Sequence, residues 1–134
     1  MKVLIIHGPN MNLLGKISEK RLTLDKLNRS IRRFSRDKSI ETKIFQSHNQ
    51  AKVISLLQSN RNKVDGVIIN LSSWHPYAYA IKDTLEIINV PYKIVEDQNI
   101  SKEHLKISIF NLKNVIKSTD IEKAYIEALG QFGG

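Results

Sequence analysis

The chain has 134 residues, of which 41% are hydrophobic, and it carries a formal net charge of +8. This length predicts one domain over residues 1–134 with a core of its own, and no apolar run is long enough to cross a membrane. The chain has no cysteine, which excludes disulfides and cysteine-based metal sites. The N-terminus enters an apolar run at once and shows no signal-peptide pattern, so we expect a cytoplasmic protein.

Basic residues outnumber acidic residues by 21 to 13, and five of them crowd one stretch: Lys26, Arg29, Arg32, Arg33 and Arg36. Such a cluster fits an anionic partner, either a nucleic acid or a carboxylate-bearing metabolite, or else a solvated helix face. We rank the solvated face first and expect no nucleic-acid partner. A small anionic metabolite stays open as a ligand, and we expect no metal or other cofactor.

The first half of the chain is predicted to alternate strands and helices. Residues 2–7 form an apolar run that indicates a buried strand, and a long loop at 8–22 follows, where an active-site lid would lie. Thr23 is the predicted N-cap of a helix with apolar residues at helical spacing. A second strand is predicted at 40–45, and the next helix begins at residue 49 or 50.

The second half continues this alternation. In chain order it comprises a strand at 64–69, a loop at 70–76, a helix to about residue 88, strands at 91–95 and 111–117, and a helix that Asp120 caps and that ends near Gly130. The whole pattern predicts an α/β fold. We expect a flavodoxin-like three-layer sandwich, whose five-stranded parallel sheet has the order 2-1-3-4-5 and carries helices on both faces.

Four segments together carry a family resemblance: GPNMNLLGK at 8–16, FQSHN at 45–49, DGVIIN at 65–70 and AIKDTL at 80–85. In this order and spacing they resemble the type II 3-dehydroquinate dehydratases, over nearly the full chain. The resemblance implies a shikimate-pathway hydro-lyase that converts dehydroquinate to dehydroshikimate. It also implies self-association into homotrimers or dodecamers.

Dehydration beside a ketone needs a base, an enolate stabiliser and an acid for the departing hydroxyl. In the family these are a tyrosine activated by an arginine, an asparagine that holds a water, and a histidine oriented by a glutamate. Asn10 matches the asparagine. Ile17 occupies the position of the arginine, and residues 17–22 contain no tyrosine. Arg21 is the cation in this segment that could swing into the site.

The segment after the fourth strand also departs from the family. Where the family reads Glu-Val-His, this chain reads Ile94, Val95 and Glu96. Glu96 is the candidate acid, provided that burial raises its pKa. Asp97 adds a second negative charge where the family binds a carboxylate substrate, and Gln98 follows as a binding candidate.

The remaining binding candidates match the family in part. Asn70 matches a substrate-binding asparagine, whereas His75 lies one residue before the family's substrate-binding histidine, whose position Pro76 takes. Asp83 matches an aspartate that reaches a neighbouring subunit's substrate, although a solvent-facing helix residue is the plainer interpretation. Lys106 aligns with the carboxylate-binding arginine and offers a point charge in place of a planar fork.

Two smaller departures affect the surroundings of the site. FQSHN transposes the family's Asn-His, so His48 and Asn49 lie one position off, and we expect them to cap the following helix rather than face the site. Trp74, Tyr77 and Tyr79 form an apolar group that we interpret as a subunit interface, the alternative being packing against the lid loop.

These losses predict a catalytically inactive or severely impaired family member that acts as a binding or structural protein. Two alternatives stay open. One is an active dehydratase that uses Glu96, His75 and Arg21 as substitutes. The other is a lyase of altered specificity, because the crevice contains Trp74 and Tyr77 beside its acidic residues.

Overall fold

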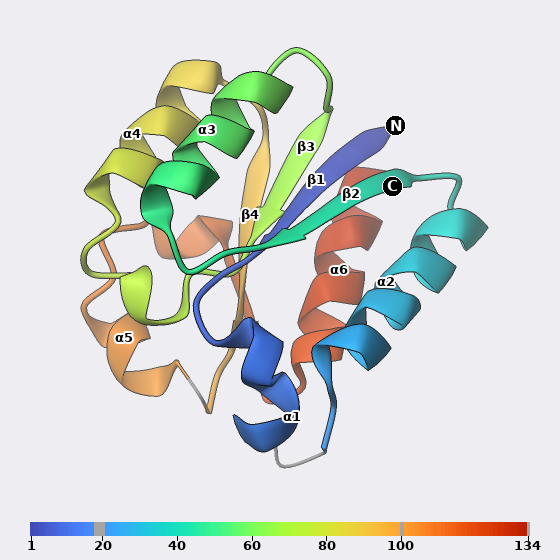
Figure 1. Ribbon diagram of the computed structural model, residues 1–134, viewed down its shortest axis with the longest axis horizontal. Helices are drawn as coiled ribbons and strands as arrows, with labels where there is room; N and C mark the ends of the chain where they lie inside the picture. Colours follow the sequence, from blue (N-terminus) through green and yellow to red (C-terminus); the bar gives the residue numbers. More distant parts are fainter. Residues whose placement is uncertain (18–20, 100, 134) are drawn as a thin grey trace.

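In the computed structural model, which describes residues 1–17, 21–99 and 101–133, five parallel strands form one sheet (Figure 1). The sheet order is β2-β1-β3-β4-β5, which confirms the predicted flavodoxin-like arrangement. The strands are β1 (Lys2–His7), β2 (Glu41–Gln46), β3 (Gly66–Ile69), β4 (Tyr92–Asp97) and β5 (Val115–Ser118).

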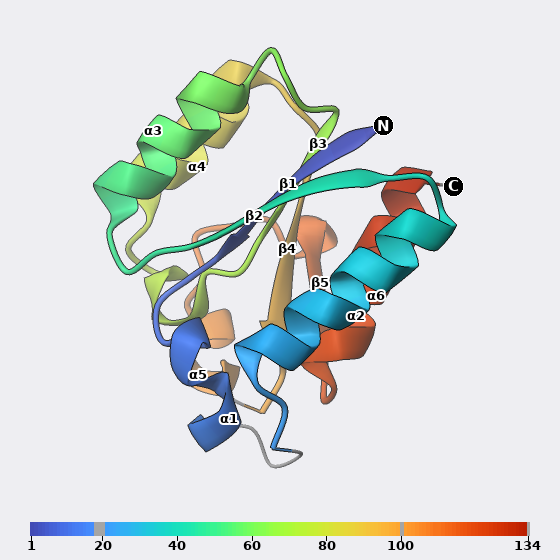
Figure 2. The same cartoon turned by 45° about the vertical axis from the view of Figure 1, so that its right-hand side comes forward.

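The central strand β1 is buried on both faces of the sheet. Val3 and Ile5 pack in the core beneath α2 (Leu24–Asp37) and α6 (Ile121–Gly133). Leu4 and Ile6 point the other way, into the core beneath α3 (Gln50–Asn60) and α4 (Tyr79–Ile88). Figure 2 shows these two helix layers on opposite sides of the sheet. A strand covered on both sides requires an unbroken apolar run, which is what the sequence has there.

Side chains cap three of the helices as the sequence predicts. Thr23 Oγ1 accepts a hydrogen bond from the Lys26 N–H, and Asn49 Oδ1 accepts from the N–H groups of the residues that begin α3. Asp120 Oδ1 accepts from the N–H of Glu122 and that of Lys123 at the start of α6. Each cap satisfies backbone donors that lack a partner within the helix.

The predicted loop at 8–22 is wrong in its first half. It contains a 3-10 turn (Met11–Leu13) and the short helix α1 (Leu14–Ile17). Met11 and Leu14 pack in the same core as α2 and α6. This burial stabilises the 3-10 turn and α1, which the local sequence pattern does not predict. The remainder of the predicted lid, residues 18–20, lies outside the described residues.

The other corrections also lie in connections and helix ends. The chain forms 3-10 turns at Ser72–Trp74 and Leu112–Asn114, and the unpredicted helix α5 (Lys102–Lys106) follows β4. The last helix continues beyond Gly130 to Gly133, because the Phe132 ring packs directly over Gly66 at the start of β3. Four strands begin later than predicted: β2 and β4 by one residue, β3 at residue 66 and β5 at residue 115.

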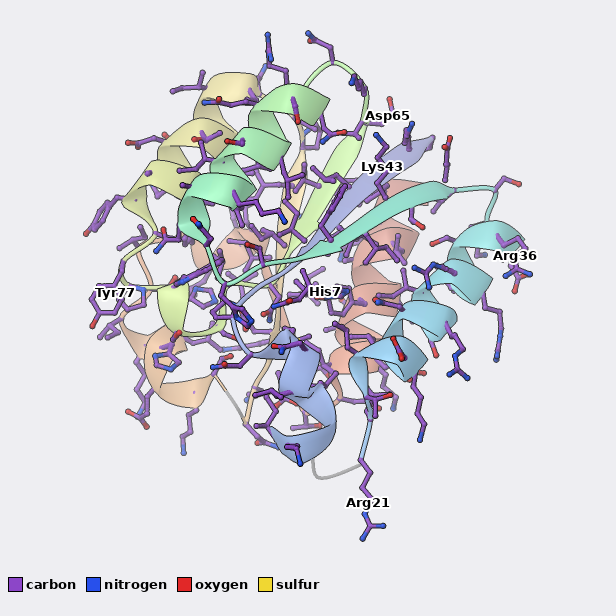
Figure 3. The ribbon with its side chains drawn as sticks, in the orientation of Figure 1. His7, Arg21, Arg36, Lys43, Asp65 and Tyr77 are labelled. Carbon is purple, nitrogen blue, oxygen red and sulfur yellow. The ribbon has the colours of Figure 1, made fainter. Side chains whose placement is uncertain are left out.

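A buried polar chain crosses the α2–α6 side of the core. His7 has no exposed surface, its Nδ1 lies 2.7 Å from the Tyr125 hydroxyl, and its Nε2 lies 2.8 Å from Asn28 Oδ1. Since Asn28 Oδ1 accepts, Nε2 carries the hydrogen and Nδ1 accepts from the hydroxyl. Burial lowers the pKa of His7 to about 4, against the opposing effect of the Asn28 hydrogen bond. Burial, reinforced by the Glu96 charge, raises the pKa of Tyr125 above its usual range. Figure 3 places His7 inside the molecule.

This histidine makes the stability of the protein depend on pH. Below about pH 6.5 the His7 side chain is protonated in the unfolded chain, whereas in the folded chain it stays neutral down to about pH 4. We therefore expect this group's contribution to the unfolding free energy to fall by about 3 kcal/mol between these two values. The His7→Gln variant lacks this titration. The difference in unfolding free energy between wild type and the variant should therefore become smaller as the pH falls. Urea unfolding at several pH values measures this.

Asn60→Ala, at a buried polar residue that does not titrate, is the control, and the loss of unfolding free energy that it causes should be constant with pH. If the difference in unfolding free energy between wild type and His7→Gln stayed constant over the same pH interval, the lowered pKa of His7 would be contradicted.

Candidate functional site

A cavity of about 380 Å³ opens at the carboxyl ends of the central strands, where parallel α/β sheets bind their ligands. Its walls come from the turn after β1, the turn after β3 and the start of α5. The lining residues are Pro9, Asn10, Leu13, Ile17, Ser72, Ser73, Ser101 and His104.

The turn after β1 brings Asn10 to this cavity. Gly8 lies so close to β3 that a Cβ atom there would stand 2.3 Å from the carbonyl oxygen of Asn70. Asn10 has a φ of 67°, in the left-handed region that asparagine tolerates better than most residues. Its N–H donates to His48 Nδ1 at 3.3 Å, so His48 supports the turn while Asn49 caps α3.

Glu96 lies beneath the cavity floor, fully buried, and both of its carboxylate oxygens are occupied. Oε1 accepts from the N–H of Leu71 at 2.8 Å and from that of Ser72 at 2.9 Å. Oε2 accepts from Asn70 Nδ2 at 3.0 Å and from the Ser101 hydroxyl at 2.8 Å. The predicted acid therefore faces protein donors on every side.

His75 completes this network from below. It is fully buried, and its Nε2 lies 2.8 Å from Glu96 Oε1 while its Nδ1 lies 2.8 Å from the Ser108 hydroxyl. Ser108 Oγ also accepts from the Phe110 N–H, and the Phe110 ring meets the imidazole edge to face. The order serine, histidine, carboxylate is that of a nucleophilic triad. Ser108 lies outside the cavity lining, so the arrangement braces the loop instead.

The structure brings Asn70, His75 and Glu96 together and places Asn10 above them. The other predicted residues lie elsewhere. Gln98 and Lys106 line a separate surface pocket, and Lys106 Nζ stands 3.4 Å from Glu103. Asp97 accepts from the Asn99 N–H in a tight turn.

Two predicted residues are solvent-facing in the described chain. Asp83 is exposed on α4, as the plainer interpretation of its sequence position expects. Arg21 is exposed, and Figure 3 shows its side chain pointing away from the body of the molecule.

Sequence reasoning missed four of the polar residues that line the cavity. Ser72, Ser73, Ser101 and His104 come from the unpredicted 3-10 turn and from α5. His104 is the one titratable side chain among the described lining residues. The run Ser101-Lys102-Glu103-His104, a helix-start pattern after a strand, is the signal that could have indicated them.

No group of three or more histidine, cysteine, aspartate or glutamate side chains that could hold a metal ion occurs in the part of the chain that the structure describes. Within the same residues, none of the helices combines the length and apolar character that a membrane crossing requires.

Comparison with known proteins gives a consistent picture. The family model "Dehydroquinase class II" matches residues 1–129. The chain is 34% identical to the 3-dehydroquinate dehydratase of Thermotoga neapolitana, covering 99% of this chain and 88% of that protein. It is 38% identical to the Clostridium acetobutylicum 3-dehydroquinate dehydratase over 75% of this chain and 72% of that protein.

Solved structures agree with these matches. A type II dehydroquinase from Butyrivibrio crossotus superposes with a TM-score of 0.89 at 29% identity, covering 100% of this chain and 98% of that one. A 3-dehydroquinate dehydratase-like protein from Bifidobacterium longum has a TM-score of 0.73 at 20% identity, covering 99% of this chain and 95% of that one, which speaks for the fold alone.

The close approach at Gly8 predicts a strong substitution effect. Gly8→Ala should lower the unfolding free energy by about 2–4 kcal/mol, because the new methyl group meets a backbone carbonyl that cannot move without displacing β3. Gly130→Ala in α6 is the matched control: nothing lies within 4 Å of its added Cβ, so it should be neutral or stabilising by up to about 1 kcal/mol. Denaturant unfolding of both variants measures this, and equal stabilities would contradict the packing.

Proposed function

The chain belongs to the class II dehydroquinase family, and we propose that it is a member without efficient dehydratase activity that acts as a binding or structural protein. The observation that carries this proposal is the chemistry of the cavity wall. Its described lining is hydroxyl, amide and aliphatic, with His104 as the single titratable group. The dehydration of dehydroquinate to dehydroshikimate needs both a base and an acid.

The aliphatic part of the wall supports the same conclusion. Ile17 lines the cavity at the position where the family resemblance places an activating arginine, and Leu13 lies beside it. An aliphatic side chain cannot lower the pKa of a neighbouring base by charge. Nothing among the described lining residues replaces the tyrosine that this arginine would activate.

The alternative of an active enzyme with substitute residues requires Glu96, His75 and Arg21 to reach a ligand. Glu96 and His75 are fully buried and bonded to each other, and Arg21 points into solvent. All three side chains would have to rearrange before they could act. His104 is better placed than any of them, which keeps a lyase of altered specificity as the second candidate.

We expect dehydroquinate dehydration to be at least ~10³-fold slower than in an ordinary family member, because general acid and base terms contribute roughly 10² or more each. Following dehydroshikimate formation at high enzyme concentration measures this, with the Thermotoga neapolitana relative as a positive control. If slow turnover occurs, Glu96→Gln and His104→Gln distinguish which group supplies the proton. A turnover near ~10 per second, an ordinary enzyme value, would refute the proposal.

We also propose that the chain self-associates, as a trimer or a multiple of three, through the outer face of α4. Tyr79, Asp83 and Ile87 recur every fourth residue and form one stripe. Tyr79 is 62% exposed and Ile87 is 81% exposed, and Tyr77 beside them is 71% exposed. Exposed aromatic and aliphatic side chains grouped in this way favour a protein interface. Trp74, expected in the same surface, instead packs against the core beneath α4.

Ile87→Lys places a charge at the most exposed apolar residue of this stripe and should convert the oligomer to smaller species at tens of micromolar protein. Leu112→Lys is the control, since Leu112 is 58% exposed, lines a pocket with Gln98 and Lys117 rather than with α4, and should leave the assembly intact. Light scattering at physiological salt measures both. A wild-type monomer under these conditions would overturn the assembly proposal, and with it the role of Asp83 in a neighbour's site.

A further inference from the structure

The groups around Glu96 form an anion-binding site, and the carboxylate of Glu96 itself occupies this site. Five hydrogen-bond partners converge on one carboxylate: Leu71 N, Ser72 N, Asn70 Nδ2, Ser101 Oγ and His75 Nε2. We call these groups the donor nest. Its two backbone N–H groups and its side-chain amide nitrogen can only donate, so they require an acceptor. Converging donors of this kind bind anions strongly.

The donor nest forms the floor of the cavity. Ser72 and Ser101 belong to both, so the cavity lies directly above Glu96. The Ser101 hydroxyl gives its hydrogen to Glu96, and the Ser72 hydroxyl gives its hydrogen to Asn70 Oδ1 at 3.2 Å. Both hydroxyl oxygens therefore present lone pairs, not hydrogens, to a ligand in the cavity.

The charge around the cavity opposes an anionic ligand. No lysine or arginine occurs among its described lining residues. The Glu96 carboxylate lies beneath two of them, in a buried setting where charges interact more strongly than in water. At the floor formed by Ser72 and Ser101, a free carboxylate would meet a like charge and acceptor oxygens, whereas a hydroxyl group would meet acceptors that it can satisfy.

We propose that Glu96 is an internal substitute for an anionic ligand, and that the cavity above it binds uncharged, hydroxylated small molecules in preference to carboxylates. This names the ligand class of the binding protein proposed above and rests on that proposal. It makes Glu96 a specificity-determining residue that acts without touching the ligand. Glu96 orients the Ser101 hydroxyl directly and the Ser72 hydroxyl through the side chain of Asn70.

The first test empties the donor nest. Glu96→Ala removes the atoms beyond Cβ, and acetate has the shape and charge of the missing group. Acetate should raise the thermal midpoint of Glu96→Ala by about 3 °C or more at saturating concentration, because it binds only the folded state. Wild type in acetate, and the variant in chloride of equal ionic strength, should shift by less than about 1 °C.

Two controls show whether acetate binds in the donor nest. Acetamide has the shape of acetate, but its NH2 group would face the N–H groups of the donor nest. It should therefore not stabilise Glu96→Ala. Adding Ser101→Ala removes one hydrogen bond to the bound anion and should weaken the acetate affinity of Glu96→Ala by about tenfold. An equal response to acetate in wild type and Glu96→Ala would overturn the internal-ligand assignment.

The second test uses wild-type protein and so does not depend on the folding of a variant. Quinate and its methyl ester are the same cyclic polyol with and without a charged carboxylate. Calorimetric titration should show the ester binding at least about threefold more tightly, the direction expected for a ligand freed from like-charge repulsion. Tighter binding of quinate, or no binding of either compound, would overturn the ligand class.

These readouts are separate from turnover. Efficient dehydration of dehydroquinate would refute the proposed function, yet the acetate response of Glu96→Ala would still report on the donor nest. Conversely, a slow enzyme that binds quinate more tightly than the ester would keep the proposed function and refute this inference.

Discussion

The Glu96 carboxylate joins segments of the chain that are distant in sequence. It accepts hydrogen bonds from the turn after β3, from His75 and from the start of α5, while its own residue lies in β4. Burying a carboxylate without hydrogen-bond partners would cost several kcal/mol of folding free energy. The donors around Glu96 offset this cost, and their positions are constrained by it. Ser72 even adopts a φ of 46°, a conformation that few non-glycine residues take, and in it the N–H reaches Glu96. The shape of the cavity follows from satisfying this charge.

The arrangement of the sheet could be predicted from sequence because its signal is local and strong. β1 and β3 are short apolar runs that only a strand covered on both faces can bury, and Thr23, Asn49 and Asp120 mark helix starts by side-chain chemistry. The helices α1 and α5 carried no such signal. They have 4 and 5 residues, too few for a periodic pattern, and α1 is stabilised by Met11 and Leu14 in the core.

The site was less predictable, because its contacts join loops whose side-chain directions the sequence does not reveal. Asn70, His75 and Glu96 were predicted as separate site candidates, and the structure joins them in one hydrogen-bonded network. Alignment alone could not show that His75, one residue early, turns inward to Glu96 rather than toward a ligand. Ser101 and His104 were missed since their helix was missed, and with it the polar wall of the cavity.

The packing of Phe132 over Gly66 has a consequence for how the protein is made. The ring covers the start of a central strand, and α6 supplies five buried residues to the core around β1: Ile121, Ala124, Tyr125, Ala128 and Leu129. During synthesis the earlier strands emerge from the ribosome with this face of the sheet uncovered. The α2 side of the core cannot close until residue 132 has emerged, so we expect the nascent chain to need shielding from aggregation until then.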